Sequence, residues 1–338
     1  MAATNSNEVL KLAHKLATTA KFKIEAATSA NRSVKFLLVE GKTDKDFMDH
    51  IKATNVDCLI ADHIFNERES GLRTRPQERI NCKDAIVQLI VGLSRFPSPF
   101  ITYPNNIDKL EIYGLVDSDC DELCAGTVTP RLFITDTHDL ETMLLSTDKS
   151  IFDRIENCNI SKQDIGQAYF IAFQLSYVRE ALEEYYDKDS FDLGKLFCGS
   201  NPVDFLSFVQ DGKINIIKLA KYVSENSIRP LSVQKFNQMC EKILKDKAVR
   251  KKFGNDGNWK QELENFNHVT TPDFWIKVNG HDILQILQYH NESVYAAFHV
   301  DCVGLNRMFE GKLISIYDYS CFIGTPLHTK MQEQGVVC

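Results

Sequence analysis

Apolar residues in the first part of the chain recur in two different patterns. Residues 7–29 carry apolar side chains three or four positions apart, which predicts an amphipathic helix. Four nearly continuous apolar runs predict strands. These runs span residues 34–39, 56–61, 112–116 and 132–135. Helices are expected after the first run, with Thr43 as the N-cap, and at residues 83–93 and 139–145. Strands that alternate with helices predict a parallel α/β sheet.

The chain loses this alternation after residue 146, and helical spacing dominates. The further helices are expected at residues 165–185, 204–208, 214–225, 232–245 and 283–289. We therefore predict an α/β domain at 1–146, preceded by its own N-terminal helix, and a mostly helical domain at 147–338. Four apolar side chains of the second domain are interpreted either as a partner surface or as core. They are Trp275, Ile276, Ile283 and Leu287.

Composition and charge narrow the possible functions. The 338 residues include 39 basic and 46 acidic ones, a net charge of −7, so any contact with nucleic acid must come from a local basic patch. Lysines interrupt every candidate signal-peptide core, and no apolar run reaches the roughly 20 residues of a membrane span. We expect a cytoplasmic protein without a membrane partner. The closest cysteine pair, Cys120 and Cys124, is a poor zinc signal.

Acidic residues follow two of the predicted strands directly. Glu40 and Gly41 follow the first strand, and the sequence Asp117-Ser118-Asp119 follows the third. Carboxyl ends of parallel strands lie along one edge of a sheet, where ligands usually bind. Such carboxylates repel each other unless a cation offsets their charge, and oxygen ligands suit Mg2+ or Mn2+. The alternative is a solvated acidic turn.

These motifs resemble the Toprim signature shared by topoisomerases, bacterial primases, OLD-type nucleases and small ribonucleases. More narrowly, the sequence resembles a Toprim-like subfamily found in prokaryotic phage-defence systems, including PARIS-type systems. The matching segments are residues 38–47 (LVEGKTDKDF), Lys83, 114–119 (GLVDSD), 138–141 (HDLE) and 278–284 (VNGHDIL). The resemblance implies a Toprim-like parallel sheet flanked by helices.

The resemblance also implies roles for individual residues. Glu40 would be the general acid/base, Asp117 and Asp119 would be metal ligands, and Glu141 would be a further ligand. Lys83 would neutralise charge or hold a phosphate, although a solvated lysine is the alternative. Three more acids are expected to support the ligands or the helix ends, and one histidine is either catalytic or structural. These residues are Asp44, Asp121, Asp139 and His281.

Two basic segments are candidates for binding a nucleic acid backbone. The first contains Arg73, Arg75 and Arg79 in a polar stretch that is typical of a long loop. The second contains Lys242, Lys245, Lys251 and Lys252. An ordinary solvated surface is the alternative for each segment, because acidic residues lie near both of them.

The function expected from the resemblance is that of a Mg2+-dependent endonuclease acting on RNA, such as transfer RNA, or on DNA. In the defence systems such a protein is a toxic antiviral effector, and an ABC-type ATPase is its partner; a homo-oligomer is also expected. Two other functions stay open. One is a haloacid-dehalogenase-like phosphatase or phosphotransferase, which also uses a strand-end Asp-x-Asp but leaves Glu40 unexplained. The other is a non-catalytic Toprim scaffold that binds a partner.

Overall fold

The computed structural model describes more than half of the chain. The described residues are 6–21, 25, 34–51, 56–66, 80–95, 110–118, 129–183, 209–210, 213–215, 218, 272–298 and 305–338. The chain forms two compact units, of which the first comprises Met1–Asp148 and Tyr317–Cys338 and the second comprises Lys149–Ile316. The expected division after residue 146 lies close to the first of these boundaries. The C-terminal segment groups with the sheet rather than with the helical unit.

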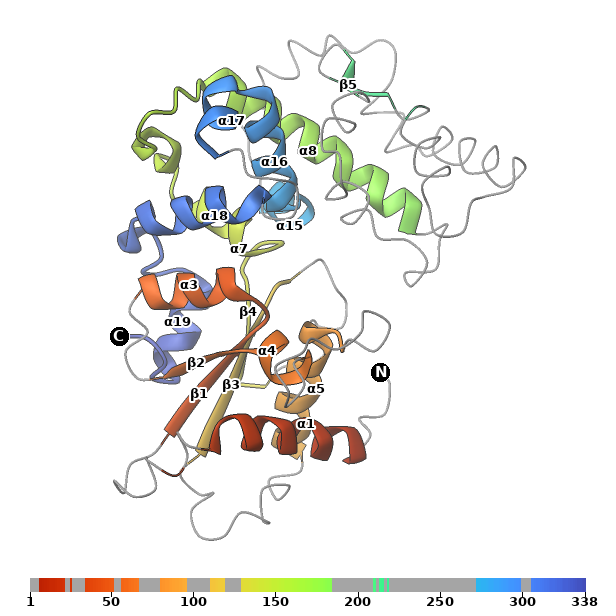
Figure 1. Cartoon of the computed structure of the whole chain (residues 1–338), viewed down its shortest axis with the longest axis vertical. Helices are drawn as coiled ribbons and strands as arrows, with labels where there is room; N and C mark the ends of the chain where they lie inside the picture. The colour runs from red at the N-terminus through yellow and green to blue at the C-terminus, as the bar shows by residue number, and fades with distance from the viewer. Residues whose placement is uncertain are drawn as a thin grey trace, which may run out of the picture. The chain divides into compact units, whose positions relative to one another are not determined.

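A parallel four-stranded sheet forms the centre of the first unit (Figure 1). Its strands are β1 (Val34–Val39), β2 (Asp57–Ile60), β3 (Leu110–Val116) and β4 (Leu132–Ile134), in the order β2-β1-β3-β4. All three pairings are parallel. The expected parallel α/β architecture is thereby confirmed, and each strand lies within two residues of its predicted run. The apolar runs are nearly continuous because both faces of the sheet are covered.

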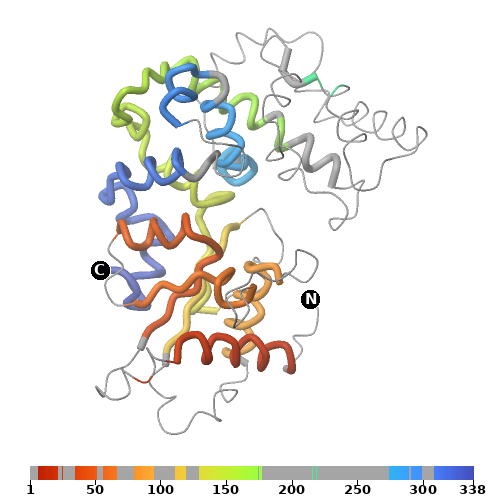
Figure 2. The backbone as a smooth tube through the Cα atoms, in the orientation of Figure 1, coloured from red at the N-terminus to blue at the C-terminus, as the bar shows by residue number. Residues whose placement is uncertain are grey.

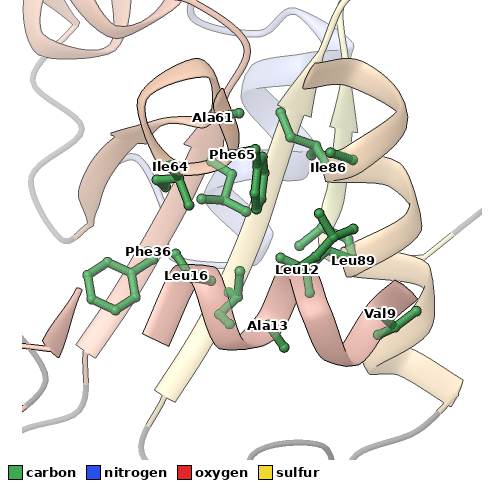
Figure 3. Packing of buried hydrophobic residues seen from close by; sticks show 14 of the residues in the cluster. Val9, Leu12, Ala13, Leu16, Phe36, Ala61, Ile64, Phe65, Ile86 and Leu89 are labelled. Carbon is green, nitrogen blue, oxygen red and sulfur yellow. The ribbon is translucent and has the colours of Figure 1, made fainter. Parts of the chain in front are cut away.

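Three helices cover one face of the sheet: α1 (Ser6–Thr19), α4 (Ala61–Asn66) and α5 (Cys82–Arg95). Their apolar side chains pack with Phe36 and Leu38 of β1 in one buried cluster (Figure 3). Alternate residues of a strand point to opposite faces, so these two side chains mark this face. Of the helix expected at residues 7–29, α1 forms the part up to Thr19; Lys21 and Glu25 are also helical, and residues 22–24 and 26–29 lie outside the described residues.

The other face carries α3 (Lys42–His50) and the C-terminal α19 (Pro326–Glu333). The ring of Phe47 lies edge-on to that of Phe322, with centroids 5.4 Å apart. Lys35 at the start of β1 donates a hydrogen bond to the Gln334 carbonyl at 3.1 Å. Figure 2 shows this C-terminal segment, in blue, beside the orange α3. Part of the second layer, α19, therefore comes from the end of the chain, which the sequence pattern did not predict.

The turn from β1 into α3 differs from the expected one. The N-cap is Gly41, not Thr43, and the Asp44 carboxylate accepts a hydrogen bond from the Gly41 N–H at 2.8 Å. An acid three residues after the N-cap can satisfy this donor, which makes a threonine cap unnecessary. Because of this hydrogen bond, the Asp44 side chain points back toward the end of β1.

The second unit is mostly helical where it is described, as expected. Its elements are η3 (Ile151–Arg154), α8 (Lys162–Glu183), α15 (Pro272–Lys277), α16 (Gly280–His290), α17 (Glu292–Phe298) and α18 (Leu305–Ile316). The antiparallel pair β5 (Val209–Gln210) and β6 (Lys213–Ile214) was not predicted, so the helix expected at 214–225 is wrong at its first residue. The helices expected at 204–208 and 232–245 lie outside the described residues.

The apolar side chains considered as a partner surface are mostly core. Trp275, Ile283 and Leu287 are at most 5% exposed, whereas Ile276 is 40% exposed. The partner-surface interpretation is therefore wrong for three of the four. In the part of the chain that the structure describes, no helix is long and apolar enough to cross a membrane.

Gly92 of α5 tests the contact between α1 and α5. A Cβ at this position would lie 2.5 Å from a Cγ atom of the buried Val9. We expect Gly92→Ala to lower the free energy of unfolding by about 1–3 kcal/mol, because overpacking outweighs the gain in helix propensity. Denaturant unfolding followed by circular dichroism measures the change.

Gly311→Ala in α18 is the matched control, since nothing lies within 4 Å of the Cβ it would add. It should be neutral or stabilising by up to about 1 kcal/mol. Adding Val9→Ala to Gly92→Ala should recover part of the stability, because it removes the methyl groups that clash. A Gly92→Ala protein as stable as the wild type would contradict the packing described for these helices.

Candidate functional site

The carboxyl ends of β1 and β3 bring the first two acids together. Val39 lies opposite Leu115 in the parallel register, so Glu40 and Asp117 each emerge at the same edge of the sheet. The Asp117 N–H donates a hydrogen bond to Glu40 Oε1 at 3.0 Å. Residues 77 positions apart are thus joined directly, as the parallel arrangement predicts.

A third and a fourth acid come from the turn between β4 and α7 (Leu140–Thr147). Asp139 is the N-cap of this helix, and its Oδ1 accepts a hydrogen bond from the Thr142 N–H at 2.8 Å. Glu141 lies in the first helical turn, where a carboxylate interacts favourably with the helix dipole. Both side chains are almost completely buried, which is rare for acids, and His138 Nδ1 lies 3.2 Å from Asp139 Oδ2.

These acids act on Asp117 together. Burial is the main cause that raises the pKa of Asp117 well above its ordinary value. The neighbouring carboxylates of Asp44, Glu40, Asp139 and Glu141 raise this pKa further. Five carboxyl groups therefore converge at one edge of the sheet.

Asp117 carries a buried oxygen that the described residues leave without a hydrogen bond. Asp117 as a residue is partly buried, but its Oδ1 has essentially no exposed surface and no hydrogen-bond partner among the residues that the structure describes. A buried oxygen without a partner costs free energy, as does the repulsion among the acids. A divalent cation would offset both costs, and an all-oxygen donor set suits Mg2+ or Mn2+. The chemistry of these oxygen donors therefore suits such an ion.

Lys83 lies at the edge of the same cluster. It is in the first turn of α5, it is only 8% exposed, and its Nζ donates a hydrogen bond to the Ser118 carbonyl at 3.3 Å. Ser118 directly follows Asp117, so the ammonium group lies one peptide away from the buried acid. This burial does not agree with the simple alternative of a solvated lysine.

Of the remaining residues expected at the site, His281 is the one that the structure describes. His281 belongs to the second unit, where its Nδ1 lies 2.8 Å from Oε1 of the buried Glu310. It follows the N-cap Asn279, whose side chain accepts a hydrogen bond from the Asp282 N–H. The remaining expected site residues lie outside the described residues. They are Asp119, Asp121, Arg73, Arg75, Arg79, Lys242, Lys245, Lys251 and Lys252.

Buried threonine hydroxyls lie around the acids and were not predicted from the sequence. Thr135, Thr137 and Thr142 are buried and hydrogen-bonded to one another or to the main chain beside Asp139. The available signal was the polar stretch from Thr135 to Thr142 directly after a short apolar strand. Threonine hydroxyls at such a strand end are common in turns, so the pattern did not stand out.

Comparison of the chain with protein-family models, curated proteins and solved structures finds no match. We therefore infer the function from the chemistry of the residues at this edge of the sheet.

Asp117→Asn tests the electrostatics of the cluster. A carboxyl group whose pKa is higher in the folded than in the unfolded state makes the protein less stable as pH rises above about 4, the ordinary value for aspartate. Without divalent cations at pH 7, the asparagine variant should therefore melt at least about 2 °C higher than the wild type, a shift that corresponds to about 1 kcal/mol. The advantage should vanish near pH 4, where the unfolded chain also holds the proton.

Thermal melts in EDTA at both pH values, and again with Mg2+, check this expectation. Mg2+ should raise the melting temperature of the wild type and leave that of Asp117→Asn unchanged, since a ligand stabilises only a state that binds it. The exposed Asp49→Asn in α3 serves as control and should behave like the wild type with Mg2+. An Asp117→Asn protein that is less stable than the wild type at pH 7 in EDTA would contradict the charge repulsion inferred for the cluster.

Proposed function

We propose that this protein is a divalent-cation-dependent nuclease of the Toprim type, with its active site at the carboxyl edge of the parallel sheet. The observation that carries the proposal is the convergence of four carboxyl groups around that of Asp117, whose Oδ1 is buried without a partner among the described residues. Cleavage of a phosphodiester needs positive charge at the phosphate and a group that moves a proton. The cluster offers residues for both tasks.

Asp117 and Glu141 are the candidate metal ligands that the structure describes, and Asp119 joins them by its place in the sequence. A bound Mg2+ or Mn2+ would supply positive charge that stabilises the additional negative charge of the transition state. Asp139 and Asp44 accept hydrogen bonds from main-chain N–H groups at the N-termini of α7 and α3, beside these ligands. Their hydrogen bonds to main-chain N–H groups restrict how far the two acids can turn.

Glu40 is the candidate general acid/base. Its Oε1 is fixed by the Asp117 N–H, which orients the carboxyl group at the edge of the sheet. A carboxylate in this position can accept a proton from the attacking water or return one to the leaving oxygen. Lys83 adds a positive charge beside the Asp117–Ser118 segment, where it can attract a phosphate oxygen.

The hydrogen bond between Glu40 and Asp117 favours the nuclease over a haloacid-dehalogenase-like phosphatase. In the phosphatase an aspartate of the Asp-x-Asp motif attacks the phosphate, and an acid at the position of Glu40 has no role. A carboxylate held beside Asp117 would also repel the incoming phosphate unless a cation or a proton offsets its charge. The Oδ1 of Asp117 argues against a purely structural scaffold, because a buried oxygen without a partner among the described residues costs free energy unless something binds it.

The biological role is proposed from the resemblance alone. A toxic effector of an antiviral system would cut RNA, such as transfer RNA, or DNA after infection, and an ABC-type ATPase would restrain it until then. No surface is assigned to the contact with the ATPase, since most of the apolar side chains considered for it are core.

Substitution of Glu40 and Asp117 separates proton transfer from metal binding. Glu40→Gln should keep the hydrogen bond to the Asp117 N–H through its amide oxygen, and should bind Mn2+ as the wild type does. Its nuclease activity should fall by about 10²–10⁴, the usual contribution of general acid–base catalysis. Asp117→Asn should lose both Mn2+ binding and activity.

The assay uses labelled DNA, messenger RNA and transfer RNA with Mg2+, Mn2+ or EDTA, and calorimetry with Mn2+ measures binding. Asp49→Asn is the control for removal of a carboxylate in the same unit. Hydrolysis of p-nitrophenyl phosphate without nucleic acid cleavage would support the phosphatase instead. Metal binding without either activity would leave a cation-binding scaffold.

The four lysines Lys242, Lys245, Lys251 and Lys252 test binding to the nucleic acid backbone. Replacing all four by glutamine should weaken binding and flatten the plot of log affinity against log salt concentration, by about 0.7–0.9 for each phosphate that the variant no longer neutralises. Filter binding in EDTA measures the slope without cleavage. Lys11→Gln with Lys21→Gln, two exposed positions, is the control. An unchanged slope would show that these lysines contact no phosphates and belong to an ordinary solvated surface.

A further inference from the structure

Thr135 lies directly after β4 and connects it to the end of β3. Its main-chain N–H donates a hydrogen bond to the Val116 carbonyl at 3.1 Å, which extends the β3–β4 ladder by one residue. Its Oγ1 accepts a hydrogen bond from the Ser118 N–H at 2.9 Å. The side chain is only 5% exposed. Thr135 therefore holds both peptides that flank Asp117.

The same hydroxyl begins a series of hydrogen bonds that ends at α7. Thr135 Oγ1 donates to the Thr137 carbonyl at 2.9 Å, and Thr137 Oγ1 donates to the Asp139 carbonyl at 3.0 Å. Thr142 Oγ1 lies 3.0 Å from Thr137 Oγ1 and accepts a hydrogen bond from the Asp139 N–H. The series thus joins the segment after Asp117 to the first turn of α7, which carries Glu141.

Neutral hydroxyl groups are suited to this position. Asp117, Asp139 and Glu141 repel one another, and charged partners on every side would compete with a cation for their oxygens. A hydroxyl holds the main chain without adding charge, because it can donate one hydrogen bond and accept another. The carboxylates are then held in place before an ion arrives, which reduces the cost of binding it.

We propose that Thr135 is a positioning residue for the cation: its hydroxyl holds the peptide that follows Asp117 and connects it to the first turn of α7, so that the Asp117 carboxylate is kept in place for the ion. The inference rests on the metal site of the proposed function, but not on nuclease activity. Residues that orient metal ligands typically change metal affinity by 10–100-fold when they are replaced. The expected effect of removing the Thr135 hydroxyl is a weakening of Mn2+ binding of about tenfold or more.

The test compares Thr135→Val with Thr135→Ser in the full chain. Valine keeps the shape of threonine but leaves the Ser118 N–H without its acceptor, whereas serine retains the hydroxyl. Calorimetry with Mn2+ should give about tenfold or greater weakening for valine and near wild-type affinity for serine. Thr147→Val is the matched control, because it removes a part-buried hydroxyl bonded to Met143 and Tyr317 at the other end of α7.

A merely structural threonine would lower the melting temperature without changing metal affinity, as we expect for Thr147→Val. Wild-type affinity in Thr135→Val, or failure of Thr135→Ser to restore it, would overturn the inference. If Thr135→Val does not fold, Thr137→Val removes the next hydroxyl of the series and should weaken binding in the same direction; unchanged affinity there overturns the inference as well. A wild type that binds Mn2+ but cleaves no nucleic acid refutes the nuclease and still allows this comparison.

Discussion

The hydrogen bond from the Asp117 peptide to the Glu40 carboxylate joins the ends of two neighbouring parallel strands, and the arrangement of the site depends on it. It requires the register in which Val39 lies opposite Leu115, because a shift of either strand by one residue would turn the side chains of that strand to the other face. The buried apolar side chains of β1 and β3 hold that register. The chemistry at the edge of the sheet is thus a consequence of how its centre packs.

Repulsion among the acids at this edge opposes the stability that the packing of the sheet provides. Asp117 and the four carboxyl groups around it destabilise one another, and the fold compensates only in part. Asp44 and Asp139 each accept a hydrogen bond from a main-chain N–H at the N-terminus of a helix. The Thr135 hydroxyl accepts one from the Ser118 N–H, directly after Asp117. Asp117 Oδ1 has no such partner among the described residues. Without a cation the carboxylates repel one another. Such a site is suited to bind a cation, because the positive charge reduces this repulsion.

Much of the local structure follows from the pattern of residues. The strand positions, the helix after Gly41 and the acids at the strand ends are all predictable, because apolar runs bounded by glycine and aspartate have few alternatives. The details of the turns are less so. Thr43 is the better N-cap by residue type, but Asp44 reaches back to the Gly41 N–H and satisfies it. Residue type alone does not decide the cap, because the N-cap is the residue whose backbone stays extended, and here that residue is Gly41.

The sequence by itself determined a parallel α/β sheet, the acids at its carboxyl edge and a resemblance to Toprim nucleases. Only the tertiary structure decided that the last helix, α19, completes the second layer on the sheet, and that Trp275, Ile283 and Leu287 are core. It also decided that the Asp139 end of α7 lies beside Asp117, and that buried threonines connect the two. Periodicity reports which face of an element is apolar, but not which distant segment covers that face. That choice is made by packing among residues far apart in the chain.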